Sequence, residues 1–178
     1  MQLSEKQKRT VPMIFPLLEG PMSNLQKAIA IAVEAHEGQT DKGGSPYILH
    51  PLRVMMSLKT EEEMIVGVLH DVIEDCSDKG FDWERLRQEG FTGEILEALY
   101  SVTKTPEEEA YFKTLSGEEK ISAYLKFVAR AKQNPIGRRV KRADIFENLN
   151  VSRLGELREK DLFRLNQYKR AVEFLDSN

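Results

Sequence analysis

The chain has 178 residues, of which 40% are hydrophobic and 31% are charged, and its formal net charge is −3. This length and composition indicate a soluble globular protein rather than a disordered chain. The nearly balanced charge argues against a protein that binds nucleic acid or a membrane surface. The single cysteine, Cys76, excludes an intramolecular disulfide bond and suits a reducing compartment, so we expect a cytoplasmic protein.

Residues 1–22 contain basic side chains followed by the apolar run Val11–Leu18, a combination that imitates a signal peptide. The run is short, two prolines interrupt it, and Glu19 follows it in place of a small-residue cleavage site. No stretch of the sequence approaches the roughly 18 apolar residues of a membrane span. We therefore predict that residues 1–22 form a capping segment on a single domain of residues 23–178.

Apolar residues at helical spacing, capping residues and Gly or Pro breaks predict a series of helices joined by short turns. No convincing alternation of period two occurs, so we predict an all-α, compact single-domain helical bundle. The helices are expected at about residues 23–37, 48–58, 61–75, 83–89, 92–102, from 105, 116–132, 136–152 and 159–174, with capping boxes at Thr105–Glu108 and Ser116–Glu119.

The third of these helices carries a polar band. His70 and Asp71 are followed one helical turn later by Glu74 and Asp75, and the surrounding residues are apolar. On one continuous helix, residues four apart share a face, so the imidazole and the three carboxylates would lie together. Carboxylates packed this closely repel one another unless a cation compensates them. A bound divalent metal explains the band, and a solvated acidic surface is the alternative.

The three histidines, His36, His50 and His70, fall within one 35-residue span. Imidazole and carboxylate ligands together suit Mn, Fe or Zn, whereas the lack of thiolate partners argues against a structural zinc site. His36 continues the apolar stripe of the first helix, so we expect it to point inward. An inward histidine of this kind is interpreted as a core residue rather than as a ligand.

A second polar cluster lies on the late helix, where Lys141, Asp144 and Asn148 are spaced three and four apart and share one face. Asp144 is flanked by apolar residues, which favours a buried functional carboxylate. The alternative is a solvated face, which is how we interpret three neighbouring polar residues, Arg139, Arg142 and Glu147.

These motifs occur in a fixed order over about residues 25–154. They are Ala35-His36-x-Gly38-Gln39, Gly44-x-Pro46-Tyr47-Ile48, His50-Pro51, His70-Asp71, Glu74-Asp75 and Lys141-x-Ala-Asp144-x-x-x-Asn148. The set resembles the HD-domain metal-dependent phosphohydrolases, and most closely the hydrolase domains of the RelA/SpoT alarmone family and their small single-domain relatives. The resemblance implies an HD-type helical bundle.

The resemblance also implies roles for individual residues. One divalent metal, usually Mn²⁺ with Fe²⁺ or Zn²⁺ as alternatives, would be bound by His50, His70, Asp71 and Asp144. The acid/base pair that acts on a metal-activated water would be Glu74 and Asp75. The phosphates and sugar of a small-molecule nucleotide would be contacted by Lys42, Lys141 and Asn148.

The implied reaction is hydrolysis of the 3′-pyrophosphate of guanosine tetra- or pentaphosphate (ppGpp or pppGpp). Bifunctional members of the family carry a separate synthetase domain that 178 residues are too few to contain, so we expect degradation rather than synthesis. A metal of this kind lowers the pKa of bound water towards about 7 and neutralises phosphoryl charge.

Three positions depart from the family pattern. Asp41 stands where these hydrolases usually carry an Arg that stacks on guanine, Gly43 stands at a common Ser, and Val151 stands where a hydroxyl is common. A carboxylate cannot supply a cation–π contact and repels phosphates. Two alternatives therefore stay open: the same chemistry on another nucleotide or phosphorylated metabolite, and a catalytically silent nucleotide-binding regulatory module. The Glu74-Asp75 pair argues against the silent module.

Overall fold

A computed structural model describes residues 24–151 and 157–177 of the chain. Within these ranges the fold is all-α, as predicted, and the backbone forms no strand beyond a single bridge between Thr40 and Pro46. None of the helices in these ranges combines the length and the apolar character that crossing a membrane requires. The predicted capping segment, residues 1–22, lies outside the described residues.

The helices follow the predicted order, and most of their ends lie within a few residues of the predicted ones. They are α1 (Leu25–Ala35), α2 (Leu49–Met56), α3 (Glu61–Leu69), α4 (Val72–Cys76), the 3₁₀ turn η1 (Ser77–Lys79), α5 (Trp83–Gln88), α6 (Gly93–Val102), α7 (Pro106–Thr114), α8 (Gly117–Gln133), α9 (Pro135–Leu149) and α10 (Glu159–Asp176).

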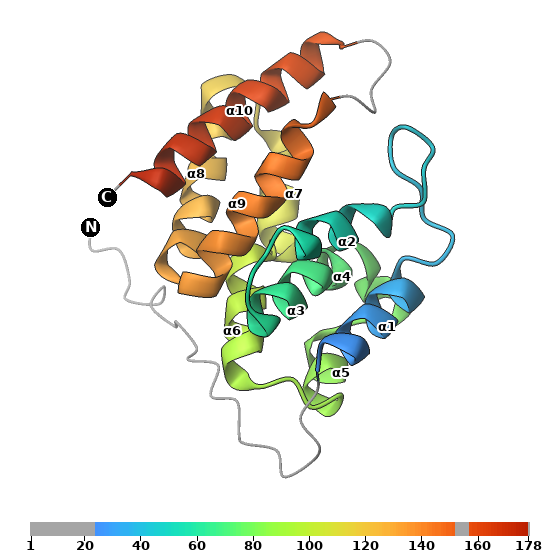
Figure 1. Cartoon of the computed structure of the whole chain (residues 1–178). Coiled ribbons are helices and arrows are strands. Elements are labelled where there is room, and N and C mark those ends of the chain that lie inside the picture. Colours follow the sequence, from blue (N-terminus) through green and yellow to red (C-terminus); the bar gives the residue numbers. More distant parts are fainter. Residues whose placement is uncertain (1–23, 152–156, 178) are drawn as a thin grey trace, which may run out of the picture.

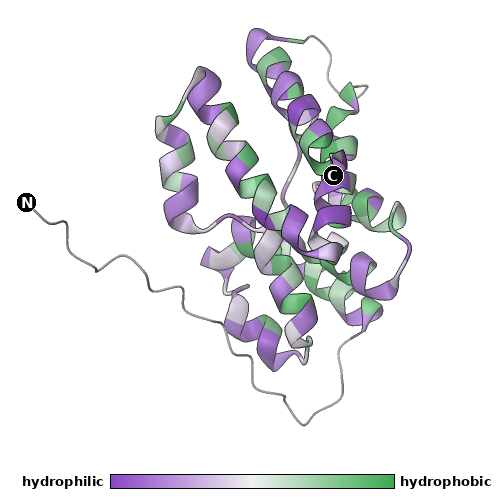
Figure 2. Ribbon diagram, turned by 90° about the vertical axis from the view of Figure 1, so that its left-hand side faces the viewer, coloured by the Kyte–Doolittle hydropathy of each residue, from purple (hydrophilic) through white to green (hydrophobic). Residues whose placement is uncertain are grey.

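The helices surround two apolar clusters. The larger cluster is built mainly from α1 to α6, and the smaller one joins α8, α9 and α10. Helix α3 packs against α1, α2, α6 and α9, while α9 also packs against α8 and α10, so α9 connects the two groups of helices (Figure 1). Most helices carry both hydrophobic and hydrophilic residues (Figure 2), which is the pattern of helices that bury one face.

Two glycines allow close approach of the helices that position the site. A Cβ atom at Gly67 of α3 would lie 2.5 Å from Leu58, just after α2, and one at Gly137 of α9 would collide with Ser101 of α6. A larger side chain at either position would require Leu58 or Ser101 to move, because its Cβ atom would overlap their side chains. Glycine therefore helps to bring α3 close to the end of α2 and α9 close to α6.

The continuous helix predicted at about residues 61–75 is wrong in one respect. Helix α3 ends at Leu69, His70 and Asp71 form a turn, and α4 begins at Val72. The Nδ1 atom of His70 lies 2.8 Å from the carbonyl oxygen of Gly67. In a continuous helix this oxygen would accept a hydrogen bond from a backbone N–H group. Such competition by a side chain interrupts helices. Consequently, the polar band does not follow one helical face.

The predicted helix starts differ in their capping. Thr105 and Glu108 form the expected reciprocal capping box at α7. Ser116 precedes α8 as expected, but its side chain makes no capping hydrogen bond, so the prediction of a capping box there was wrong.

Along α9, the side chains of Arg139 and Arg142 are 60% and 47% exposed, as a solvated face requires. The side chain of Glu147 is only 15% exposed, because it pairs with Arg53. The interpretation of Glu147 as solvated was therefore wrong.

Candidate metal and nucleotide site

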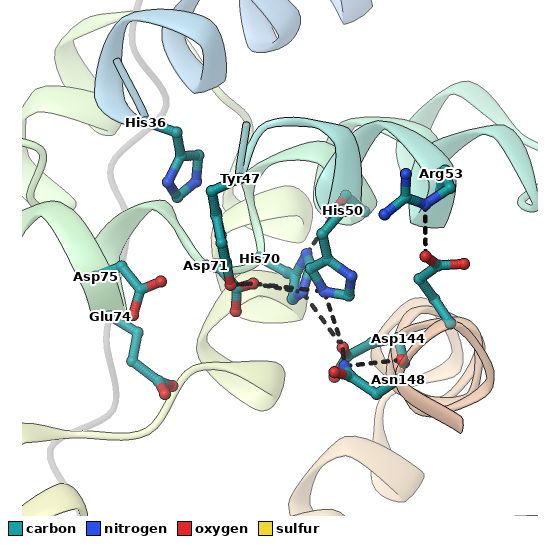
Figure 3. Close-up of polar contacts among 12 residues, drawn as sticks. His36, Tyr47, His50, Arg53, His70, Asp71, Glu74, Asp75, Asp144 and Asn148 are labelled. Carbon is teal, nitrogen blue, oxygen red and sulfur yellow. Dashed lines mark hydrogen bonds and ion pairs between the residues drawn. The ribbon is translucent and has the colours of Figure 1, made fainter. Parts of the chain in front are cut away.

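Three helical segments bring two imidazoles and a carboxylate together. His50 comes from α2, His70 from the turn after α3, and Asp144 from α9, and each offers one ligand atom within 4.8 Å of the other two (Figure 3). The Oδ1 atom of Asp144 lies 3.3 Å from Nε2 of His50 and 3.6 Å from Nε2 of His70. All three residues are buried. Residues up to 94 positions apart in the sequence thus share one small polar cluster.

Asp71 faces the same cluster. Its Oδ2 atom lies 3.0 Å from Nε2 of His70 and 3.7 Å from Nε2 of His50. Burial would raise the pKa of this carboxyl, but the His70 imidazole beside it holds the pKa well below its usual range. Burial would likewise lower the pKa of His70, whereas Asp71 and Asp144 raise it. The cluster therefore favours positive charge between its carboxylates.

The donor set fits a divalent cation. Nδ1 of His70 must donate to the Gly67 carbonyl, so in the neutral imidazole the lone pair of Nε2 points towards the carboxylates, where a cation would replace the proton. Among the described residues, Nε2 of His70 is a buried nitrogen without a hydrogen-bond partner, and Nε2 of His50 faces Asp71 and Asp144. Imidazole and carboxylate ligands around a common point suit Mn²⁺, Fe²⁺ or Zn²⁺.

The carboxylates of the cluster are held by neighbouring side chains. The Tyr47 hydroxyl donates to Oδ2 of Asp71 over 2.6 Å, and the amide of Asn148 donates to Oδ1 of Asp144 over 2.6 Å. Nζ of Lys141 donates to Oδ2 of Asp144 over 2.9 Å. Such contacts fix ligand orientation before a metal arrives. The sequence predicted Lys141 and Asn148 as nucleotide contacts, but here both support Asp144, and the predicted contact stays a prediction.

Glu74 is held by a residue that the sequence analysis did not single out. Its carboxylate accepts a hydrogen bond of 2.9 Å from the backbone N–H of Lys104 and forms an ion pair with the Lys104 ammonium group. The same ammonium donates to Glu109 over 3.1 Å. Lys104 lies 30 residues after Glu74, in the turn between α6 and α7, so no local spacing signals this contact.

Asp75 and His36 lie beside the cluster. Asp75 is exposed, and partial burial together with the negative charge of Asp71 raises the pKa of its carboxyl. His36 is 2% exposed, as predicted, and lies outside the cluster of candidate metal ligands.

A cavity of about 400 Å³ opens at this cluster. This volume lies within the range of about 300–1,000 Å³ that small-molecule sites usually occupy. His50, Asp71, Asp144 and Glu74 line one part of it. Elsewhere its walls combine cationic and aromatic side chains, namely Lys42, Lys104, Lys141, Arg164, Tyr47, Tyr124 and Tyr168. Cations and aromatic rings near buried carboxylates suit a ligand that carries phosphates and a ring.

Helix α10 contributes two cavity residues that the sequence analysis missed. The guanidinium carbon of Arg164 lies 5.7 Å from the ring centre of Tyr168, and this ring lies 6.0 Å from that of Tyr124 on α8. Arg164 and Tyr168 are one helical turn apart and therefore share a face. The spacing was visible in the sequence, but the cavity that this face borders was not.

The loop between α1 and α2 forms another wall of the cavity, and Asp41 shapes it. Oδ1 of Asp41 accepts hydrogen bonds from the backbone N–H groups of Gly43 and Ser45, over 2.8 and 2.9 Å. This is a side-chain-closed turn of the kind that Asp favours. Asp41 and Lys42 both line the cavity. The acidic residue that departs from the family pattern is thus part of the loop's own structure.

No family model matches the chain. Three relatives illustrate its similarity to curated proteins. It is 41% identical to guanosine-3′,5′-bis(diphosphate) 3′-pyrophosphohydrolase of Vibrio cholerae over 34% of this chain and 9% of the relative. It is 34% identical to the bifunctional (p)ppGpp synthase/hydrolase SpoT of Escherichia coli over 58% of this chain and 14% of the relative. It is 31% identical to GTP pyrophosphokinase of Myxococcus xanthus over 80% of this chain and 19% of the relative.

These relatives confirm the resemblance to the RelA/SpoT hydrolase branch that the motifs predicted. The matched part spans less than a fifth of the length of each of the three relatives.

Proposed function

We propose that this chain is an HD-type hydrolase domain that removes the 3′-pyrophosphate of ppGpp or pppGpp with the help of a divalent metal. The observation that carries the proposal is the meeting of His50, His70, Asp71 and Asp144 beside a cavity lined by cationic side chains. The names of the relatives support the choice of substrate. A cytoplasmic location and a domain of residues 23–178 belong to the same proposal.

His50, His70, Asp71 and Asp144 would hold the metal, with Mn²⁺ as the first candidate and Fe²⁺ or Zn²⁺ as alternatives. When bound, such a cation would acidify water and neutralise charge on a phosphoryl group. Tyr47, Lys141 and Asn148 keep the two carboxylates in place through the hydrogen bonds described above. The ligand geometry is thereby fixed in advance, which lowers the cost of reorganisation during binding.

Other residues in or beside the cavity would act on substrate and protons. Lys42, Lys104 and Arg164 would bind the anionic phosphates, because ammonium and guanidinium groups form charge-assisted hydrogen bonds with phosphate oxygens. Glu74, which lines the cavity, would accept the proton of the attacking water, and Asp75 would complete the acid/base pair. Lys104 would then serve both the substrate and Glu74, since its ammonium group already pairs with that carboxylate.

The second candidate function is the same hydrolysis on another nucleotide or phosphorylated metabolite. The specific observation that favours it is Asp41, whose carboxylate lines the cavity and supports the loop instead of offering a cation to a base. Arg164, which faces the cavity from α10, is the residue that can supply cation–π stacking in its place.

The test is release of pyrophosphate by the purified chain with Mn²⁺, using ppGpp, pppGpp and a panel of other nucleotides. We expect GDP and pyrophosphate from ppGpp, and no release after metal removal by a chelator. If another nucleotide is hydrolysed and ppGpp is not, the second candidate function replaces the first. Nucleotide binding without turnover of any compound would overturn both in favour of a silent binding module.

A further inference from the structure

A chain of side-chain contacts leads from the core to Asp75. Nδ1 of His36 lies 2.7 Å from Oε1 of Gln39, and Nε2 of Gln39 donates to Oδ2 of Asp75 over 3.3 Å. His36 closes α1 as its C-cap residue, and Gln39 opens the loop that follows. Figure 3 shows His36 and Asp75 on the same side of Tyr47.

The chemistry of this chain fixes its direction. The Asp75 carboxylate accepts, so the amide nitrogen of Gln39 must face it, and the amide oxygen of Gln39 must face His36. An amide oxygen only accepts hydrogen bonds, so Nδ1 of His36 must be the donor in this contact. Only one tautomer of His36 and one orientation of the Gln39 amide satisfy both contacts.

His36 itself has little freedom. It is 2% exposed, its ring centre lies 5.0 Å from that of Tyr47, and its Nδ1 lies 3.6 Å from Sγ of Cys76. The Cys76 thiol is in turn placed by a hydrogen bond to the carbonyl of Ala35. A ring packed in this way holds Gln39 more firmly than solvent could, because its rotamers are blocked.

We propose that Gln39, oriented by His36, is a positioning residue that holds Asp75 for proton transfer. The inference rests on the proposed function, because the Gln39–Asp75 hydrogen bond can affect the rate only if Asp75 takes part in the reaction. Oδ2 of Asp75 is occupied by the Gln39 amide, which leaves Oδ1 as the atom that exchanges a proton. The negative charges of Asp71 and Glu74 act on Asp75 and raise the pKa of its carboxyl.

The experiment compares Gln39→Met and Gln39→Glu with the wild type. Methionine keeps the length of the side chain without a donor, and glutamate still accepts from His36 but repels Asp75. Because misplaced catalytic groups cost up to about 100-fold in rate, we expect kcat to fall about 10- to 100-fold. For Gln39→Met, KM and metal content should stay unchanged. Gln39→Glu should have the lower kcat, and its KM should rise as well, because Gln39 lines the cavity and the new carboxylate repels phosphates.

The matched control is Gln88→Met. Gln88 is exposed on α5 and donates to the Glu84 carboxylate over 2.9 Å, so this change removes the same kind of hydrogen bond away from the cavity. It should leave kcat at the wild-type value. A rise in KM with unchanged kcat for Gln39→Met would make Gln39 a substrate contact and overturn the proposal.

A double-mutant cycle separates positioning from a structural role. In an Asp75→Asn background, Gln39→Met should slow the enzyme no further, because the carboxylate that it positions is already gone. An equal loss in both backgrounds would overturn the proposal, since a merely structural effect adds to any other defect.

A measurement that needs no turnover completes the test. The Gln39 amide stabilises the ionised form of Asp75, so Gln39→Met should raise the pKa of this carboxyl in a carbon-13 NMR titration. An unchanged pKa would reject the positioning contact. Lack of hydrolysis by the wild type would instead reject the proposed function, so the two failures are distinguishable.

Discussion

The two walls of the cavity are built differently. The wall of candidate metal ligands comes from α2, the α3–α4 turn and α9. Its imidazoles and Asp144 are buried, and hydrogen bonds hold His70 and Asp144 in place. The second wall comes from the loop after α1, where Lys42 and Gly43 are exposed and Asp41 closes a turn. One wall is rigid because packed helices carry it, whereas the other depends on a short loop.

This difference separates two tasks. A metal site needs its ligands within a few tenths of an ångström, which packed helices supply. Recognition of a nucleotide can be changed by exchanging loop residues without disturbing the core. We therefore expect changes in the helical wall to act on metal content and rate, and changes in the loop wall to act mainly on KM and substrate choice.

The largest effect is expected from Asp71→Asn. Loss of a residue that merely supports a ligand costs about 10–100-fold in metal affinity or activity, so loss of a proposed ligand should exceed about 100-fold. Metal analysis by atomic spectrometry after dialysis should find the variant empty and inactive. Asp78→Asn, at an exposed aspartate of η1, is the control. Full metal occupancy of Asp71→Asn would remove Asp71 from the ligand set.

Glu74→Gln should retain the metal but lose most of its kcat. An amide cannot accept the proton, and general acid–base catalysis contributes about 10²–10⁴-fold. Steady-state kinetics and metal analysis of the same preparation measure both quantities. Glu109→Gln removes the other carboxylate that pairs with Lys104 and should leave kcat close to the wild-type value. If both variants were equally slow, the pairing of Lys104 rather than the base would be responsible.

Tyr47→Phe should weaken metal binding without abolishing it. The change deletes only the hydroxyl that donates to Asp71 over 2.6 Å, and the expected cost is about 10-fold in metal affinity. Titration of the metal-free protein with Mn²⁺ by calorimetry measures the effect. Tyr111→Phe, at an exposed tyrosine of α7, is the matched control. Equal affinities for Tyr47→Phe and wild type would show that Asp71 needs no support.

The smallest effect is expected at Asp41, where two variants separate charge from structure. Asp41→Asn can still accept from Gly43 and Ser45 but no longer repels phosphates, so KM for ppGpp should fall roughly 2- to 5-fold, the size of an exposed charge interaction. Asp41→Ala loses the turn as well, and its KM should rise above that of Asp41→Asn. The kcat of both should stay near that of the wild type. A large loss of metal in either variant would contradict the separation of the two walls.

Much of the fold could be predicted because it depends on local chemistry. Apolar spacing and capping residues signal helices directly, as at Thr105 and Asp82, whose side chains cap α7 and α5. The burial of His36 followed from the apolar stripe of its helix. The break after Leu69 did not follow, because it accompanies a hydrogen bond between the His70 side chain and the backbone that propensity cannot anticipate.

The sequence by itself determined the helical class, the order of the elements and the residue types of the candidate metal site. Only the tertiary structure decided which of those residues meet and what holds them, such as Lys104 on Glu74 and Arg164 beside the cavity. The physical reason is that periodicity reports which face of a helix is apolar, whereas contacts between helices depend on how their surfaces pack in space. Close packing at Gly67 and Gly137 helps bring together side chains that lie far apart along the chain.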